Sequence, residues 1–143
     1  MTDLYQQTIV EHAKRPRNFG PLPGANRGAQ GVNPLCGDEI ELHLRVEGDR
    51  VEAATFEGAG CAVCVASASM MTLAVKGSSA ADAARLMQRV RDLVAGGDGK
   101  NLGEIESLKG VARYPARRKC ALLAWRALEA ALAGEATQVS TEL

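Results

Sequence analysis

Cysteine is the residue type in this 143-residue chain that is best suited to chemistry, and it occurs at positions 36, 61, 64 and 120. Cys36 is followed directly by Gly37 and Asp38. Because glycine permits a sharp backbone turn, the Cys36 thiol and the Asp38 carboxylate can face the same point. This short stretch therefore offers a sulfur and an oxygen ligand to one site.

Two of the other cysteines stand where a thiolate is favoured. Cys61 follows Gly60 at the predicted start of a helix, where backbone N–H groups attract negative charge. Cys120 follows a basic stretch that includes Arg118 and Lys119, whose positive charges have the same effect. Both positions favour metal binding or nucleophilic chemistry over a purely structural thiol.

Three thiolates and one carboxylate can form a tetrahedral zinc shell, and that set would leave a charge of about −2 on the site. Arg118 and Lys119 would partly offset this charge. Oxygen donation by Asp38 would also make the site less closed than one built from thiolates alone. An exchangeable ligand is what a reactive metal centre requires.

Ordinary structural roles are open to several of these residues. Cys64, one turn into the predicted helix, fits a small buried apolar residue, and Asp38 can simply cap a turn. Cys61 and Cys64 form a CxxC pair, but neither a thioredoxin-like setting nor a second CxxC accompanies it. The lone histidines His12 and His43 carry little weight as metal ligands.

Composition and charge exclude several classes of protein. The 17 basic and 17 acidic residues give a formal net charge of +0, which argues against broad binding of nucleic acid. An aromatic fraction of 3% argues against base-stacking surfaces. No apolar run is long enough for a membrane span, and residues 1–17 lack the pattern of a signal peptide. We therefore expect a cytoplasmic protein whose cysteines do not form disulfides.

Hydrophobic periodicity predicts the elements that position the cysteines. A helix is expected over 3–13, ending before Pro16, and a turn-rich loop over 20–31. Alternating apolar and polar residues predict an antiparallel hairpin, with an edge strand before it. The expected strands are 39–46 and 51–56, with 29–33 at the edge.

The second half of the chain is predicted to be helical. The expected helical stretches are 61–75, 80–94, a short piece at 102–108, and a last helix from Tyr114-Pro115 to Gly134. The polar tail 135–143 is expected to be frayed. We predict a single domain over 1–143 of the α+β class, with a small antiparallel sheet of about three strands packed against helices.

Three cysteine blocks resemble, in their order, those of the U-type iron–sulfur cluster assembly proteins, the IscU and NifU N-terminal family. The blocks are Asn33-Pro34-Leu35-Cys36-Gly37-Asp38, then Phe56-Glu57-Gly58-Ala59-Gly60-Cys61 with 66–71, and Arg118-Lys119-Cys120-Ala121-Leu122-Leu123-Ala124-Trp125. The opening of the chain, with Pro16-Arg17-Asn18-Phe19-Gly20, is similar as well. The resemblance covers nearly the whole chain and implies a SufE/NifU-like fold.

Within that family the details resemble the SufU branch. IscU-type proteins place a histidine before the last cysteine, where this chain has Lys119, and the segment between Cys61 and Cys120 looks longer here. The resemblance implies zinc bound by Cys36, Asp38, Cys61 and Cys120. It also implies that Cys36 accepts persulfide sulfur from a SufS-like cysteine desulfurase.

Three functions remain open at this point. The first is zinc-dependent sulfur transfer for iron–sulfur cluster assembly. The second is a scaffold on which a [2Fe–2S] cluster is assembled on the same residues, since iron also accepts thiolates. The third is a structural zinc domain that only mediates protein contacts. Cys64 stands where the family usually has Ser or Ala, and it is interpreted as inert, as an alternative ligand or as a sulfur relay.

Overall fold

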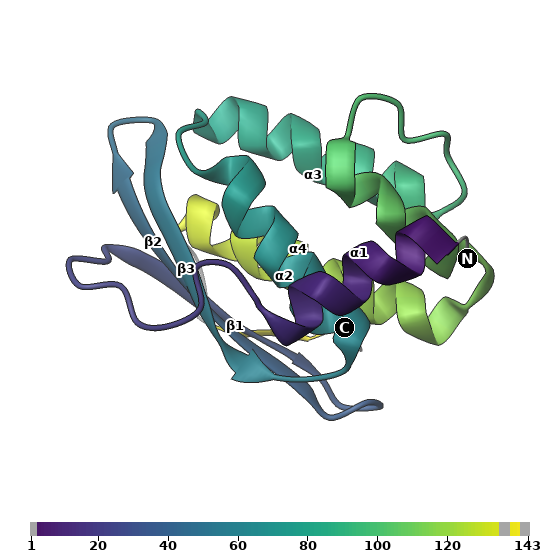
Figure 1. Cartoon of the computed structure of the whole chain (residues 1–143). Helices are drawn as coiled ribbons and strands as arrows, with labels where there is room; N and C mark the ends of the chain where they lie inside the picture. Colours follow the sequence, from purple (N-terminus) through teal and green to yellow (C-terminus); the bar gives the residue numbers. More distant parts are fainter. Residues whose placement is uncertain (1–2, 135–137, 141–143) are drawn as a thin grey trace.

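The computed structural model describes residues 3–134 and 138–140 of the chain. In chain order the elements are α1 (Asp3–Lys14), β1 (Arg27–Asn33), β2 (Asp38–Glu47), β3 (Arg50–Ala59), α2 (Ala62–Val75), α3 (Ala80–Val94), η1 (Gly103–Arg113), α4 (Pro115–Ala133) and β4 (Gln138–Ser140). The segment η1 is a run of 3₁₀ turns. Figure 1 shows the strands as one layer, with the helices gathered on one of its faces. This arrangement is the predicted α+β class.

The hairpin of β2 and β3 confirms the two predicted central strands. In β2 the side chains of Ile40, Leu42 and Leu44 are fully buried, while the residues between them are more exposed. Because side chains alternate along a strand, this pattern turns one face of the sheet to the helices and the other to solvent. The solvent face carries His43, whose Nε2 lies 2.8 Å from Oε1 of Glu57 on β3.

Strand β1 corrects the expectation of a loop over 20–31. It begins at Arg27 and pairs antiparallel with β2, from Arg27 opposite Leu44 to Asn33 opposite Asp38. The expected edge strand 29–33 lies within it. Gly28 hides the strand in the sequence, because glycine weakens a strand pattern. The pairing nevertheless needs this glycine, since a Cβ there would lie 2.9 Å from the Leu42 carbonyl oxygen.

A short fourth strand completes the sheet. β4 pairs parallel to β1, and the strand order is β3-β2-β1-β4. The three expected antiparallel strands are confirmed, and β4 is an addition to them. The frayed tail expected over 135–143 therefore differs at 138–140, where the backbone is paired. The tail residues 135–137 and 141–143 lie outside the described residues.

Helix α2 lies at the centre of the helical layer, in contact with α1, α4, η1 and β3. Its own side chains are small or apolar on nearly all sides and most of them are buried, which is typical of a buried helix. Its buried Ser67 donates through Oγ to the Ala121 carbonyl oxygen at 2.6 Å and accepts from Nε1 of Trp125 at 3.0 Å. These bonds join α2 to α4, the two helices whose beginnings carry Cys61 and Cys120.

The helix bounds agree with the predicted stretches to within one residue, except at the end of η1. Cys61 is the N-cap of α2 instead of its first residue, and Ser79 caps α3 by accepting from the Asp82 backbone N–H. The short piece expected at 102–108 extends to Arg113. α4 ends at Ala133, and its C-cap Gly134 has a φ of 67°, which favours glycine. Within residues 3–134 and 138–140, no helix has the length and apolar character needed to cross a membrane.

Candidate metal centre

The loop between β1 and β2 presents Cys36. Asn33 ends β1 opposite Asp38, and its carbonyl oxygen accepts from the backbone N–H groups of Cys36 at 3.3 Å and Gly37 at 2.9 Å. Gly37 has a φ of 72°, a conformation that glycine adopts without strain. The loop turns back sharply enough to leave Cys36 exposed at its tip and Asp38 buried at the start of β2.

The Asp38 carboxylate lies against the beginning of α2. Its Oδ1 accepts from the Cys61 backbone N–H at 2.8 Å, where the helix N-terminus favours negative charge. Gly60 permits this contact, because a Cβ at that position would lie 2.7 Å from Oδ1. Asp38 therefore does not merely cap a turn of its own loop. It joins the β1–β2 loop to α2.

Cys120 brings α4 to the same point. Its Sγ and the Sγ of Cys36 are 3.7 Å apart, with the Cys120 thiol donating. Ligand atoms from Cys36, Asp38 and Cys120 all lie within 4.8 Å of one another. The Cys61 thiol is outside that group but lies near enough to contribute to the raised pKa of Cys120. Three predicted ligand residues are thus brought together, and the fourth lies beside them.

Burial governs the chemistry of the Cys120 thiol. Cys120 is fully buried, and its pKa is raised well above the ordinary range of a thiol. The main cause is burial, with smaller contributions from its neighbours Asp38, Cys61 and Cys36. In the metal-free protein this thiol keeps its proton at neutral pH. A bound metal must therefore displace it, because thiolate is the ligand form.

The donor set fits a zinc ion. Thiolate sulfur and carboxylate oxygen are both ordinary zinc ligands, and four such donors complete a tetrahedral shell. Arg118 and Lys119 were expected to offset the negative charge of the site, but the hydrogen bonds of the Arg118 guanidinium go to another part of the chain. The guanidinium of Arg118 donates to the Ala112 carbonyl oxygen through Nε at 2.6 Å, so its hydrogen bonds serve the end of η1. Cys36 is the exposed member of the site, whereas Asp38 and Cys120 are buried.

Cys64 and the two histidines are placed elsewhere. Cys64 is fully buried in the core, and burial raises its pKa, as expected for a small apolar residue. His12 is buried between helices, with Nδ1 2.7 Å from Ser69 Oγ and Nε2 3.2 Å from Oε1 of Glu104. His43 stands on the solvent face of the sheet beside Glu57. The hydrogen-bond partners of the two histidines, and the burial of Cys64, explain their positions without a metal.

Two residues of the site carry no clear signal of their own in the sequence. Asn33 donates through Nδ2 to Asp38 Oδ2 at 3.3 Å and to Cys120 Sγ at 3.5 Å. Gly60 leaves room for the Asp38 carboxylate. Both belong to quoted cysteine blocks, but their type alone does not separate a ligand-supporting role from an ordinary turn.

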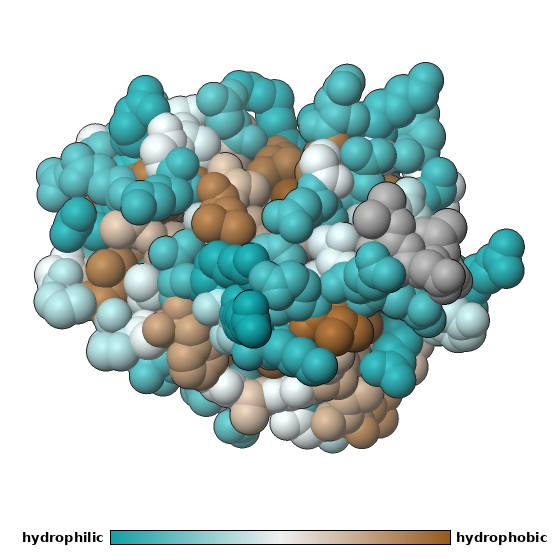
Figure 2. Space-filling model, viewed as in Figure 1, coloured by the Kyte–Doolittle hydropathy of each residue, from teal (hydrophilic) through white to brown (hydrophobic). Residues whose placement is uncertain are grey.

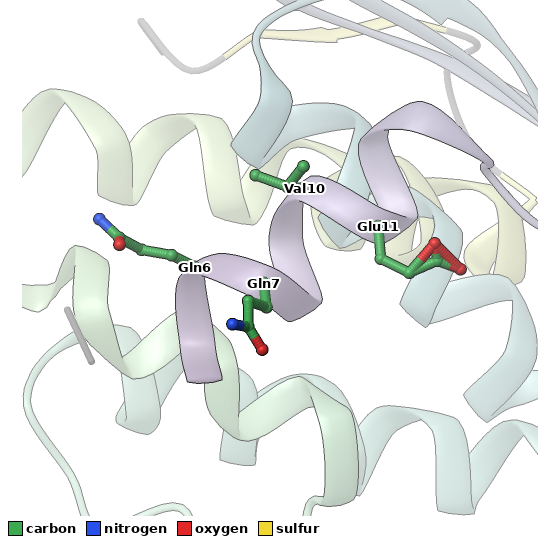
Figure 3. A pocket seen from close by; sticks show the side chains of 4 residues that line it. All are labelled: Gln6, Gln7, Val10 and Glu11. Atoms are coloured by element: carbon green, nitrogen blue, oxygen red, sulfur yellow. The ribbon is translucent and has the colours of Figure 1, made fainter. Parts of the chain in front are cut away.

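Three hollows formed elsewhere on the surface by described residues contain no thiol. One of about 350 Å³ lies along the exposed side of α1 and is lined by Gln6, Gln7, Val10 and Glu11 (Figure 3). Its lining comes from one helix face and contains no thiol. On the face seen in Figure 2, apolar residues form separate areas between hydrophilic ones. The thiol cluster is therefore the best candidate for a functional site.

Comparisons with known proteins identify the family to which the chain is similar. Residues 4–135 match the model of the NifU-like N terminal domain. The chain is 46% identical to "Zinc-dependent sulfurtransferase SufU" of Bacillus subtilis, covering 92% of this chain and 91% of that protein. It is 42% identical to "Iron-sulfur cluster assembly scaffold protein IscU" of Streptococcus pyogenes, covering 92% of this chain and 84% of that protein.

A solved structure supports the same assignment. It is a candidate iron–sulfur cluster assembly scaffold protein for the SUF system from Fervidobacterium islandicum, with a TM-score of 0.82 and 32% identity. It covers 88% of this chain, which in turn covers 94% of it. The resemblance to U-type proteins, including SufU, is confirmed. The chain belongs to the NifU-like N-terminal domain family of iron–sulfur cluster assembly proteins.

Proposed function

We propose that this protein accepts persulfide sulfur at Cys36 from a cysteine desulfurase, with zinc held by Cys36, Asp38, Cys61 and Cys120. The observation that carries the proposal is an exposed thiol grouped with two buried ligand residues within 4.8 Å. A closed structural site has no need to present one of its sulfur atoms to solvent. The similarity to a relative named as a zinc-dependent sulfurtransferase supports the same function.

The proposed reaction is the attack of the Cys36 thiolate on a persulfide of the partner. When bound, zinc supplies the charge that keeps the ligand thiols deprotonated near neutral pH. The Cys36 thiolate attacks the outer sulfur of the desulfurase persulfide, and a new S–S bond forms on Cys36. The S–S bond of the partner breaks, and the partner cysteine leaves as a thiolate. No external oxidant or reductant is needed, because the sulfane sulfur only changes its carrier.

The position of each residue in the site indicates its role. Cys120 and Asp38 are buried and anchor the site from α4 and β2. Cys36 can approach a partner because it stands on an exposed loop. Exposed Arg113 and Arg117 flank the start of α4 and can attract an acidic partner surface. A cytoplasmic location suits the four free thiols, because disulfides are rare in that compartment.

A second candidate function is a scaffold for a [2Fe–2S] cluster on the same residues. The observation that favours it is the 42% identity with a relative named as a cluster assembly scaffold. Thiolate ligands suit iron as well as zinc, so the donor set does not separate the two. Lys119 counts against the scaffold, because an ammonium group is not a metal ligand.

The proposal is tested with Cys36→Ser and a matched Cys64→Ala variant. Each zinc-loaded protein is mixed with a desulfurase and cysteine, and the rate of sulfide or alanine release is measured. Cys36→Ser is expected to abolish stimulation while keeping the fold, because the side chain is exposed. Cys64→Ala is expected to stimulate like the wild type. Full stimulation by Cys36→Ser would exclude Cys36 as the acceptor.

Two further measurements separate the rival functions. A structural zinc site should protect all its thiols from alkylation, whereas the proposed site should lose Cys36 to the reagent first. Anaerobic reconstitution with iron and sulfide tests the scaffold. A stable visible cluster spectrum, together with transfer of the cluster to an apo-protein, would favour the scaffold over sulfur transfer.

A further inference from the structure

Asn33 occupies a central place in the candidate metal centre without being one of the predicted ligands. It is 1% exposed and lies at the end of β1, directly opposite Asp38 in the ladder. Its backbone carbonyl oxygen holds the loop that presents Cys36. Its side chain reaches Asp38 and Cys120. One residue therefore contacts the segments that carry three of the four proposed ligands.

The chemistry of the carboxamide suits this position. The Asn33 side-chain nitrogen carries two N–H donors, and it lies 3.3 Å from Asp38 Oδ2 and 3.5 Å from Cys120 Sγ. An ionised carboxylate only accepts hydrogen bonds, so the amide nitrogen must face Asp38. A metal-bound thiolate is likewise an acceptor. The same two donors therefore fit the site with its ligands deprotonated.

Each oxygen of the Asp38 carboxylate accepts a hydrogen bond from a different neighbour. Oδ2 accepts from the Asn33 side chain, while Oδ1 accepts from the Cys61 backbone N–H at 2.8 Å. Held from both sides, the carboxylate has little freedom to rotate. A carboxylate fixed in this way presents its remaining lone pairs in one direction.

We propose that Asn33 is a positioning residue. The two N–H donors of its carboxamide hold the Asp38 carboxylate and the Cys120 sulfur in the orientation that metal binding requires. The inference rests on the proposed metal centre and adds a residue to it that binds no metal itself. Outer-shell partners of this kind typically change metal affinity about 10- to 100-fold when they are removed. Asn33 also lowers the electron density on the Cys120 sulfur, because its N–H is directed at that atom.

The test compares Asn33→Leu, which keeps the branching at Cγ and loses the donors, with Asn26→Leu. Asn26 is a matched control because its carboxamide also makes two hydrogen bonds, donating to the Val46 carbonyl oxygen at 2.7 Å and accepting from the Val46 backbone N–H at 2.8 Å, on an exposed part of the molecule. Zinc affinity is measured by competition with a chromogenic chelator. The same proteins are titrated with Co²⁺, and the sulfur-to-cobalt charge-transfer bands are recorded. Asn33→Ala provides a second variant if Asn33→Leu does not fold.

We expect zinc affinity to fall about 10- to 100-fold in the Asn33 variant and to stay unchanged in Asn26→Leu. The charge-transfer bands of the Asn33 variant should also shift, because a hydrogen bond to a ligating sulfur is lost. A merely structural residue would lower the melting temperature without moving these bands. Wild-type zinc affinity with an unchanged cobalt spectrum in a folded Asn33 variant would overturn the inference.

Failure of the proposed function gives a different result. If the wild-type protein binds zinc but Cys36 receives no sulfur, the transfer function is wrong and the role of Asn33 stands. If sulfur transfer occurs and the Asn33 variants bind zinc like the wild type, the transfer function stands and the role of Asn33 is wrong. A wild-type protein that binds no zinc would overturn both.

Discussion

Replacing Gly60 by Ala should damage the metal centre through a single added carbon atom. A Cβ at this position would lie 2.7 Å from Asp38 Oδ1, about 0.7 Å inside the 3.4 Å at which ordinary contact begins. The φ of Gly60 is not positive, so alanine can adopt the same backbone conformation and steric contact is the whole effect. The carboxylate must therefore move away from the start of α2.

The size of the effect follows from what the carboxylate would lose. Its bond from the Cys61 backbone N–H is 2.8 Å long, and a shift of about 0.7 Å would take it past the usual limit for such a bond. A hydrogen bond to a charged group contributes about 1.5–3 kcal/mol. Since about 1.4 kcal/mol corresponds to a factor of ten in binding, zinc affinity should fall about 10- to 100-fold.

The assay is zinc affinity by chelator competition, with Gly31→Ala as the matched control. A Cβ at Gly31 would meet the end of the flexible Leu123 side chain at 3.0 Å, away from the Asp38 carboxylate. Both substitutions crowd their surroundings and should lower the melting temperature of the metal-free protein. Only Gly60→Ala should weaken zinc binding. Equal zinc affinity in Gly60→Ala and the wild type would refute this reasoning.

Two further predictions concern residues outside the ligand set. Cys64→Ala should leave zinc affinity unchanged. Burial raises the pKa of the Cys64 thiol in the folded protein. Above about pH 8.5 the unfolded chain therefore loses this proton while the folded chain keeps it. Ionisation then favours the unfolded state, so the metal-free protein should lose stability as the pH rises. In Cys64→Ala, chemical denaturation should show this loss reduced by up to about 1.4 kcal/mol per pH unit; an unchanged slope would contradict the interpretation. His12→Phe should cost about 1–3 kcal/mol by removing the His12 bond to the buried Ser69 hydroxyl, which would keep only the Arg17 backbone N–H as a partner. It should also lower hydrogen-exchange protection in α1 without changing zinc affinity. Unaltered protection would show that His12 does not hold α1 in place.

Much of the site was predictable because its chemistry is local in the sequence. The Cys36-Gly37-Asp38 stretch forms the expected sharp turn, and the positive φ of Gly37 is the reason it can. The start of α2 directly after Cys61 follows from the change of periodicity that comes after Gly58 and Gly60. These features depend on neighbouring residues alone, so a single sequence carries them.

The parts that escaped prediction depend on contacts between distant segments. Only residues 29–33 of β1 were expected to form a strand, at the end of a stretch interpreted as a loop up to residue 31. Gly28 and Gly31 weaken the strand pattern, and only the pairing with β2 makes the strand. The short strand β4 has no signal of its own, since three residues are too few for a period. Asn33 resembles any turn-forming asparagine until Cys120 is packed against it, 87 residues later in the chain.

The measurement that tests the central claim most directly is the location of transferred sulfur. The zinc-loaded protein is incubated with a cysteine desulfurase and isotopically labelled cysteine, the thiols are then alkylated, and the peptides are mapped by mass spectrometry. The account predicts one added labelled sulfur on the peptide that contains Cys36. Label on the peptide with Cys61 and Cys64, or no label on any cysteine while the desulfurase turns over, would contradict it.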